Sequence, residues 1–169
     1  MIEVLRLGHR PFRDKRLSTH VFLTARAFGA NNGYYSGNKD DELENSISKI
    51  AKEFGGDFSV KHVENGLKLV KEKKKEGYKI VHLTVYGKSV KEKIKEVKGK
   101  ILIVVGGAKV EPGYYEISDF NLSVTNQPHS EVASLAIFLD YFLEGKEFEL
   151  DFKGKIKIIG VEKGKKILE

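Results

Sequence analysis

Hydrophobic positions along the chain follow two alternating patterns, and each pattern is typical of one kind of secondary structure. Short apolar runs predict strands at residues 2–7, 33–36, 58–63, 80–86, 101–105 and 121–124. Apolar residues that recur every three or four positions, together with capping residues, predict helices at residues 17–27, 40–54, 65–76, 90–97, 111–116 and 129–142. Strands that alternate with helices predict an α/β fold, a doubly wound parallel sheet with helices on both faces.

Two of these segments are apolar enough to be placed in the core. Residues 101–105 form an uninterrupted β-branched run, which is typical of a strand buried on both faces of a parallel sheet. The helix predicted at 129–142 is apolar nearly all round, so we expect it to be buried. By contrast, residues 8–15 are charged and contain Pro11, which predicts a loop before a helix capped by Ser18 or Thr19.

The last part of the chain has a different pattern. Residues 148–152 and 155–161 flank Lys153-Gly154, which predicts a β-hairpin. A length of 169 residues suits one domain. We therefore expect an α/β domain over residues 1–145, with residues 146–169 as a hairpin extension of the same domain.

Composition excludes several classes of protein. The chain has no cysteine, which rules out disulfides and thiolate metal sites. No run approaches the roughly 20 apolar residues that a membrane-spanning helix needs. The first ten residues, MIEVLRLGHR, lack the apolar centre of a signal peptide. We therefore expect a cytoplasmic protein with neither a metal nor a membrane partner.

Positive charge is divided unevenly between lysine and arginine. The formal net charge is +6, and residues 61–100 alone hold 13 Lys against 5 Glu. All five arginines lie in the first 26 residues, at Arg6, Arg10, Arg13, Arg16 and Arg26. A guanidinium offers a rigid fork of donors for phosphate or carboxylate, so this segment predicts anion recognition, although chance would also produce such a cluster. The lysines fit solvated helix faces as well as they fit RNA contact.

Two segments are candidates for a ligand site at the carboxyl edge of the sheet, where open α/β sheets bind ligands. In the first, VVGGAKVEPGYY at residues 104–115, a buried strand runs into Gly106-Gly107, and glycine allows a ligand to approach the backbone. It matches neither a dinucleotide nor a Walker signature, so a plain strand-to-helix turn is the alternative. In the second, the polar residues 125–130 precede the apolar helix, and an elaborate helix cap is the alternative.

The titratable residues show no arrangement typical of hydrolysis. His129 lies at a predicted helix start, where the helix dipole disfavours its cation, so we interpret it as pocket lining. No nucleophilic triad, carboxylate pair or metal-ligand spacing is present. A group-transfer reaction, in which the protein mainly positions the reactants, fits the absence of such residues better than hydrolysis does.

Three segments resemble the motifs of the SPOUT superfamily of RNA methyltransferases, and specifically the archaeal tRNA (cytidine-56) 2′-O-methyltransferase family. They are residues 6–30, 104–124 and 125–142. The resemblance implies a C-terminal trefoil knot, an exception to the usual unknotted topologies, with S-adenosylmethionine bound in it. It also implies a homodimer with composite active sites, and 2′-O-methylation of cytidine 56 in the T-loop of tRNA.

The same resemblance implies roles for individual residues. Many superfamily members carry a catalytic arginine in the first helix, where this chain has Leu23. The role then moves to Arg10, Arg13 or Arg16; we favour Arg16, with Arg10 beside it and Asp14, a phosphate or water as the proton acceptor. The implied cofactor contacts are Leu83, Gly106, Gly107, Ala108, Lys109, Val110, Val124, Thr125, Asn126, Gln127, Pro128, His129, Ser130 and Glu131.

Other functions remain open at this stage. The first is a SPOUT methyltransferase that acts on rRNA or on another tRNA position. The second is a non-catalytic RNA-binding domain, which would need no cofactor motif. The third is a small-molecule α/β enzyme, which would lack the salt-dependent RNA binding of a phosphate-reading protein.

Overall fold

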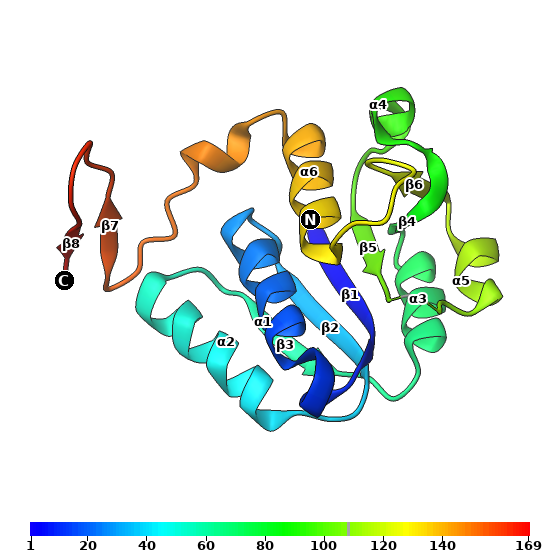
Figure 1. Ribbon diagram of the computed structural model, residues 1–169, viewed down its shortest axis with the longest axis horizontal. Coiled ribbons are helices and arrows are strands. Elements are labelled where there is room, and N and C mark those ends of the chain that lie inside the picture. Colours follow the sequence, from blue (N-terminus) through cyan, green and yellow to red (C-terminus); the bar gives the residue numbers. More distant parts are fainter. Residues whose placement is uncertain (108) are drawn as a thin grey trace.

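A computed structural model of the chain describes residues 1–107 and 109–169, and all side chains in these ranges except that of Lys15. Its body is a six-stranded sheet in which every neighbouring pair of strands is parallel (Figure 1). The strands are β1 (Ile2–His9), β2 (Asn32–Gly37), β3 (Ser59–His62), β4 (Lys79–Ser89), β5 (Ile101–Val105) and β6 (Phe120–Ser123). All six predicted strands are therefore confirmed, and so is the α/β fold.

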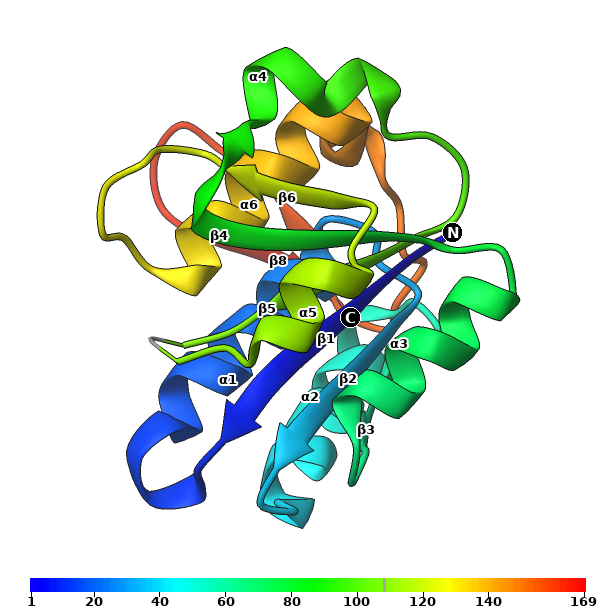
Figure 2. The ribbon, with the colours of Figure 1, turned by 90° about the vertical axis from the view of Figure 1, so that its right-hand side faces the viewer.

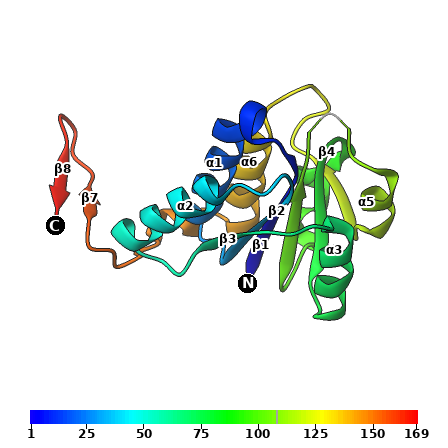
Figure 3. The ribbon, with the colours of Figure 1, turned by 90° about the horizontal axis from the view of Figure 1, so that it is seen from below.

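Helices cover both faces of the sheet. They are α1 (Pro11–Ala27), α2 (Asp41–Phe54), α3 (Gly66–Lys75), α4 (Val90–Lys93), α5 (Pro112–Ile117) and α6 (Glu131–Leu143), with 3-10 turns η1 (Ile94–Glu96) and η2 (Lys146–Glu149). Figure 3 shows α1, α2 and α6 on one face, and α3 and α5 on the other. Two apolar clusters fill the two interfaces. Val4 belongs to the first cluster and Leu5 to the second, as the alternation of a strand requires.

The strand order is β3-β2-β1-β5-β4-β6, and it has a topological switch between β1 and β5. From β1 the chain builds outward through β2 and β3, then crosses to the other half of the sheet. In open α/β sheets a crevice forms outside the carboxyl ends of the strands at such a point. The fold therefore places a crevice at the ends of β1 and β5, which the local sequence patterns do not specify.

The segment before the first helix was predicted wrongly as a loop. The helix begins at Pro11, and the amides of Arg13 and Asp14 already bond the carbonyl of Arg10. Proline suits the first helical position, since its φ is preset and its missing N–H would have no partner there. Ser18 is not the cap; its hydroxyl lies 2.7 Å from Nδ1 of buried His9.

The last helix is buried along one side only. Leu135 and Phe138 are fully buried, whereas Ile137 and Tyr141 are each 43% exposed. The prediction of full burial is wrong for this chain on its own, because α6 packs on α1 and the sheet with one face only.

The C-terminal hairpin exists, but it forms further along the chain than predicted. Its strands are β7 (Lys157–Ile159) and β8 (Lys166–Leu168), paired antiparallel, and it projects from the body (Figure 1). Residues 152–154 contact the body instead. The guanidinium of Arg26 lies over the ring of Phe152, and Lys153 forms an isolated bridge with Gly55. These long-range contacts explain why the local turn signal at Lys153-Gly154 was misleading.

Candidate active site

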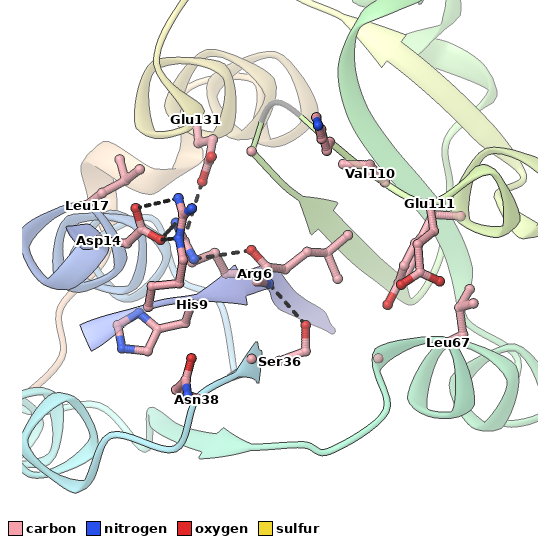
Figure 4. A pocket seen from close by; sticks show the side chains of 18 of the residues that line it. Arg6, His9, Asp14, Leu17, Ser36, Asn38, Leu67, Val110, Glu111 and Glu131 are labelled. Carbon is pink, nitrogen blue, oxygen red and sulfur yellow. Dashed lines mark hydrogen bonds and ion pairs between the residues drawn. The ribbon is translucent and has the colours of Figure 1, made fainter. Parts of the chain in front are cut away.

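A cavity of about 1020 Å³ opens at the carboxyl ends of β1 and β5, where the strand order switches (Figure 4). One wall comes from the end of β1 and the first turns of α1. A second wall comes from the loop between β5 and α5, together with the first residue of α6. The loops that follow β2 and β3 complete the lining. The volume lies at the upper end of the range that small-molecule and cofactor sites occupy.

Arg6 is the central charge of this site. Its side chain is only 2% exposed and projects from β1 toward the face covered by α1 and α6. A terminal nitrogen lies 3.7 Å from Oδ2 of Asp14, and Nε lies 3.5 Å from Oε2 of Glu131. Burial lowers the pKa of Arg6, and the two carboxylates offset part of that effect. One buried guanidinium thus joins the first turn of α1 to the first residue of α6.

Arg10 and Asp14 form a second, more exposed pair on the same wall. The Arg10 guanidinium donates to both carboxylate oxygens of Asp14, at 2.8 and 3.2 Å. This bidentate contact is the main reason why the pKa of Asp14 is lowered. The Arg10 side chain is 54% exposed, so its outer edge remains open to a ligand while Asp14 holds it in place.

A buried polar network centred on His9, which itself lines the cavity, holds this wall in place. Nε2 of His9 lies 3.0 Å from Oδ2 of Asp40, while its other ring nitrogen meets the Ser18 hydroxyl. Asp40 also caps α2 by accepting from the Leu43 amide. Although serine, histidine and aspartate meet here, both His9 and Ser18 are fully buried, so the network ties β1, α1 and α2 together.

The predicted cofactor segments gather at the same edge of the sheet (Figure 2). β4 breaks register beside β6, so that Leu83 and Lys88 both pair with Leu122 and residues 84–87 bulge outward. Nδ2 of Asn126 donates to the carbonyls of Val85, at 2.6 Å, and Gly87, at 3.2 Å. This amide fastens the loop after β6 to the bulge in β4.

The structure brings only some of the predicted site residues to the cavity. Those that line it are Arg10, Asp14, Gly107, Lys109, Val110 and Glu131. Those that do not are Arg16, Leu83, Gly106, Val124, Thr125, Asn126, Gln127, Pro128, His129 and Ser130. Ala108 lies outside the described residues. Residues 125–130 are exposed at the loop surface, and Arg16 is exposed on α1, within the helix and not before it as predicted.

Several residues of the cavity were not predicted. Arg6 belongs to the arginine cluster, but the signal for its role is its place inside a predicted strand, where Glu3 is the other charged residue, because a buried arginine needs anionic partners. Residues 36–38 and 64–67 also line the cavity, but no local sequence pattern predicts this. The order of the strands in the sheet is what brings them to the site.

Comparison with known proteins decides the family. The profile described as tRNA ribose 2′-O-methyltransferase, aTrm56, matches residues 54–168. The chain is 50% identical to the tRNA (cytidine(56)-2′-O)-methyltransferase of Metallosphaera sedula, covering 98% of this chain and 97% of that protein. The chain belongs to the archaeal tRNA (cytidine-56) 2′-O-methyltransferase family. The predicted resemblance is confirmed.

Other members of the family extend over different lengths. The enzyme of Methanopyrus kandleri is 45% identical, over 97% of this chain and 94% of that protein. The Picrophilus torridus relative is 50% identical over 98% of this chain, but the chain spans only 48% of that protein.

Solved structures support the fold of the family. An A. aeolicus TrmH/SpoU tRNA modifying enzyme superposes with a TM-score of 0.64 at 18% identity, covering 90% of this chain and 79% of that one. The SpoU methyltransferase AviRb from Streptomyces viridochromogenes, in complex with AdoMet, gives 0.61 at 11% identity, covering 86% and 57%. At these identities the likeness concerns the fold alone.

The described residues bear on two possible partners, a membrane and a metal ion. No helix among them is long and apolar enough to cross a membrane. Across residues 1–107 and 109–169 there is no group of three or more His, Asp or Glu side chains that could hold a metal ion.

Asn126 offers a first test of the cofactor segment. We expect Asn126→Asp to weaken S-adenosylmethionine binding by up to about thirtyfold, because a carboxylate cannot donate to the two carbonyls and each lost hydrogen bond is worth ~1 kcal/mol. Isothermal titration of the purified protein with the cofactor measures this. Asn45→Asp, the same change at an exposed site on α2, is the control. Equal affinity of both variants would show that the bulge needs no anchor.

Proposed function

We propose that the chain binds S-adenosylmethionine and transfers its methyl group to the ribose 2′-hydroxyl of cytidine 56 in the T-loop of tRNA. Membership of the family supports the reaction and the substrate. The observation that supports the site is the cavity at the switch between β1 and β5, which Arg6, Arg10 and Arg13 line together with Gly107. An anionic, splayed nucleotide suits such a cavity.

The residues present fit the cofactor that the family implies. A Cβ added at Gly107 would meet nothing nearer than the Glu131 carboxylate, at 3.6 Å, so the backbone there is open to a ligand. Beside it, residues 125–130 expose their polar groups. We place the cofactor between these loops and the bulge at 84–87, with Leu83 on the adenine side. When bound, it supplies an electrophilic methyl group.

The chain itself contributes position and charge. Asp14 holds the Arg10 fork at the cavity wall, where we assign it to a phosphate or to the ribose of the nucleotide. Arg16 is exposed and has no partner among the described residues, which leaves its guanidinium free to stabilise charge on the 2′-oxygen. Removing one such donor costs roughly 10²–10³ in rate, and alignment of oxygen and methyl contributes roughly 7–11 kcal/mol.

A second copy of the chain would complete this site. Arg16 lies on α1 three residues beyond Arg13, which lines the cavity, so the two share neighbouring positions on the helix surface. The exposed apolar residues Ile137 and Tyr141 on α6 suit burial in a homodimer. We therefore propose a cytoplasmic homodimer with composite active sites. The trefoil knot belongs to the same proposal.

Methyl transfer from labelled S-adenosylmethionine to unmodified tRNA transcript, with the modified nucleotide mapped, tests the function directly. We expect label on the ribose of cytidine 56 and none on a transcript whose residue 56 is already 2′-O-methylated. Label elsewhere in the tRNA, or only on rRNA, would show that the chain carries out the same reaction on a different substrate. Tight tRNA binding without any transfer would favour a non-catalytic RNA-binding domain.

A further inference from the structure

Two buried atoms of the site lack a hydrogen bond within the described part of the chain. Nε of Arg6 and Oε2 of Glu131 lie 3.5 Å apart, and neither has a hydrogen-bond partner there. Each of these atoms is closed to solvent, so the two face one another as a buried ion pair. Both residues line the cavity, and the other oxygen of Glu131, Oε1, faces the Gly107 loop, 3.6 Å from a Cβ built on Gly107. A carboxylate oxygen on that side can accept a hydrogen bond from the hydroxyl group of a ligand.

Glu131 stands where the two halves of the proposed reaction meet (Figure 4). It is the first residue of α6 and directly follows the loop at 124–130. Its Oε1 is the atom nearest to a Cβ built on Gly107. On its other side lies Arg6, beyond which is the first turn of α1. The carboxylate therefore lies between the cofactor loops and the segment that carries the arginines.

The two carboxylates nearest to Arg6 differ in their ability to take up a proton. Both oxygens of Asp14 accept from Arg10, and its pKa is lowered, which makes it a weak base. Burial raises the pKa of Glu131, and this effect outweighs the opposing charges of Arg6 and Arg10; Asp14 raises it further. Lys109, from the loop after β5, shares the cavity. Burial thus makes Glu131 the stronger base of the two.

We propose that Glu131 is the general base that takes the proton of the ribose 2′-hydroxyl, and that Arg6 is a positioning residue that holds its carboxylate. The inference rests on the proposed function. The 2′-oxygen forms a bond to the methyl carbon as the bond from that carbon to the sulfonium sulfur breaks. The hydroxyl proton passes to Oε1 of Glu131. The products are the methyl ether, a neutral thioether and a protonated Glu131, which then releases its proton to water.

Glu131→Gln tests this assignment, because it keeps the shape of the side chain and removes the base. We expect turnover on tRNA to fall by about 10²–10⁴, the usual contribution of a general base, with cofactor and tRNA dissociation constants within about threefold of the wild type. Glu131→Asp should retain part of the activity. Glu116→Gln, an exposed site on α5, is the control for the loss of one negative charge.

The pH dependence gives a second measurement. Because the pKa of Glu131 is raised, its ionised fraction falls as the pH drops through a value above the ordinary range of glutamate. The wild-type rate should fall over that pH interval, and the Glu131→Gln variant should lose this dependence. An equal loss of cofactor affinity and turnover in Glu131→Gln would overturn the proposal, since it would make Glu131 a cofactor contact only.

A titration of the free protein measures the protonation of Glu131 without RNA. Carbon NMR of glutamate-labelled protein should show one carboxyl that titrates above the others and is missing in Glu131→Gln. If all glutamates titrate in the ordinary range, Glu131 is not the base. Failure of the proposed function looks different: the wild-type protein would place no label on cytidine 56, while this titration would be unchanged.

Discussion

Replacing Arg16 by alanine is expected to lower turnover on tRNA by roughly 10²–10³, with the dissociation constant of S-adenosylmethionine unchanged. Arg16 is exposed on α1, outside the lining of the cavity, and no described residue holds it. Its loss should therefore leave fold and cofactor loops intact and remove only charge stabilisation at the 2′-oxygen. Single-turnover kinetics with labelled cofactor, beside titration of cofactor binding, measures both quantities.

Two further variants make the Arg16 result specific. Arg16→Lys keeps the charge without the fork and should recover only part of the rate. Arg13→Ala removes a guanidinium that lines the cavity one turn earlier, and should weaken tRNA binding and reduce its salt dependence by about one phosphate contact. Equal losses of turnover and cofactor affinity in Arg16→Ala would contradict the role assigned to Arg16.

Replacing Arg6 by methionine should destabilise the fold by about 3–5 kcal/mol, because it leaves the buried carboxylate of Glu131 without its cation. Glu131 would lose its nearest cation, while Asp14 would keep Arg10. For a domain of this size the melting temperature should drop by on the order of 10 °C. Denaturant unfolding followed by circular dichroism gives the change in the free energy of unfolding.

The effect of Arg6→Met should also depend on pH, and the sign follows from Glu131. Burial already raises the pKa of Glu131, and removal of Arg6 raises it further, so the variant gains stability relative to the wild type as the pH falls and Glu131 becomes protonated. The deficit should therefore be larger at pH 8 than at pH 5. Arg10→Met, at a half-exposed pair that solvent screens, should lower the free energy of unfolding much less than Arg6→Met does. A deficit that does not depend on pH would mean that packing, and not charge, is what Arg6 supplies.

Much of the secondary structure could be predicted because its causes are local. The apolar run of β5 and the amphipathic face of α2, with Leu43, Ile47 and Ala51 buried, follow from neighbours in sequence. The errors lie where a local signal competed with a distant contact. Lys153-Gly154 reads as a turn, but Phe152 is held by Arg26, and the hairpin forms further on. Pro11 reads as a loop residue, yet it starts α1.

The sequence by itself determined the α/β class, the order of the elements and the family. Hydrophobic periodicity, helix-capping residues and family motifs each depend only on residues that are close together in the chain. Only the tertiary structure decided which strand ends meet. The switch between β1 and β5 sets Arg6, Asp14 and Glu131 around one cavity, although up to 125 positions separate them in the chain. Burial, which lowers the pKa of Arg6 and raises that of Glu131, is a property of the packed molecule and of no single segment.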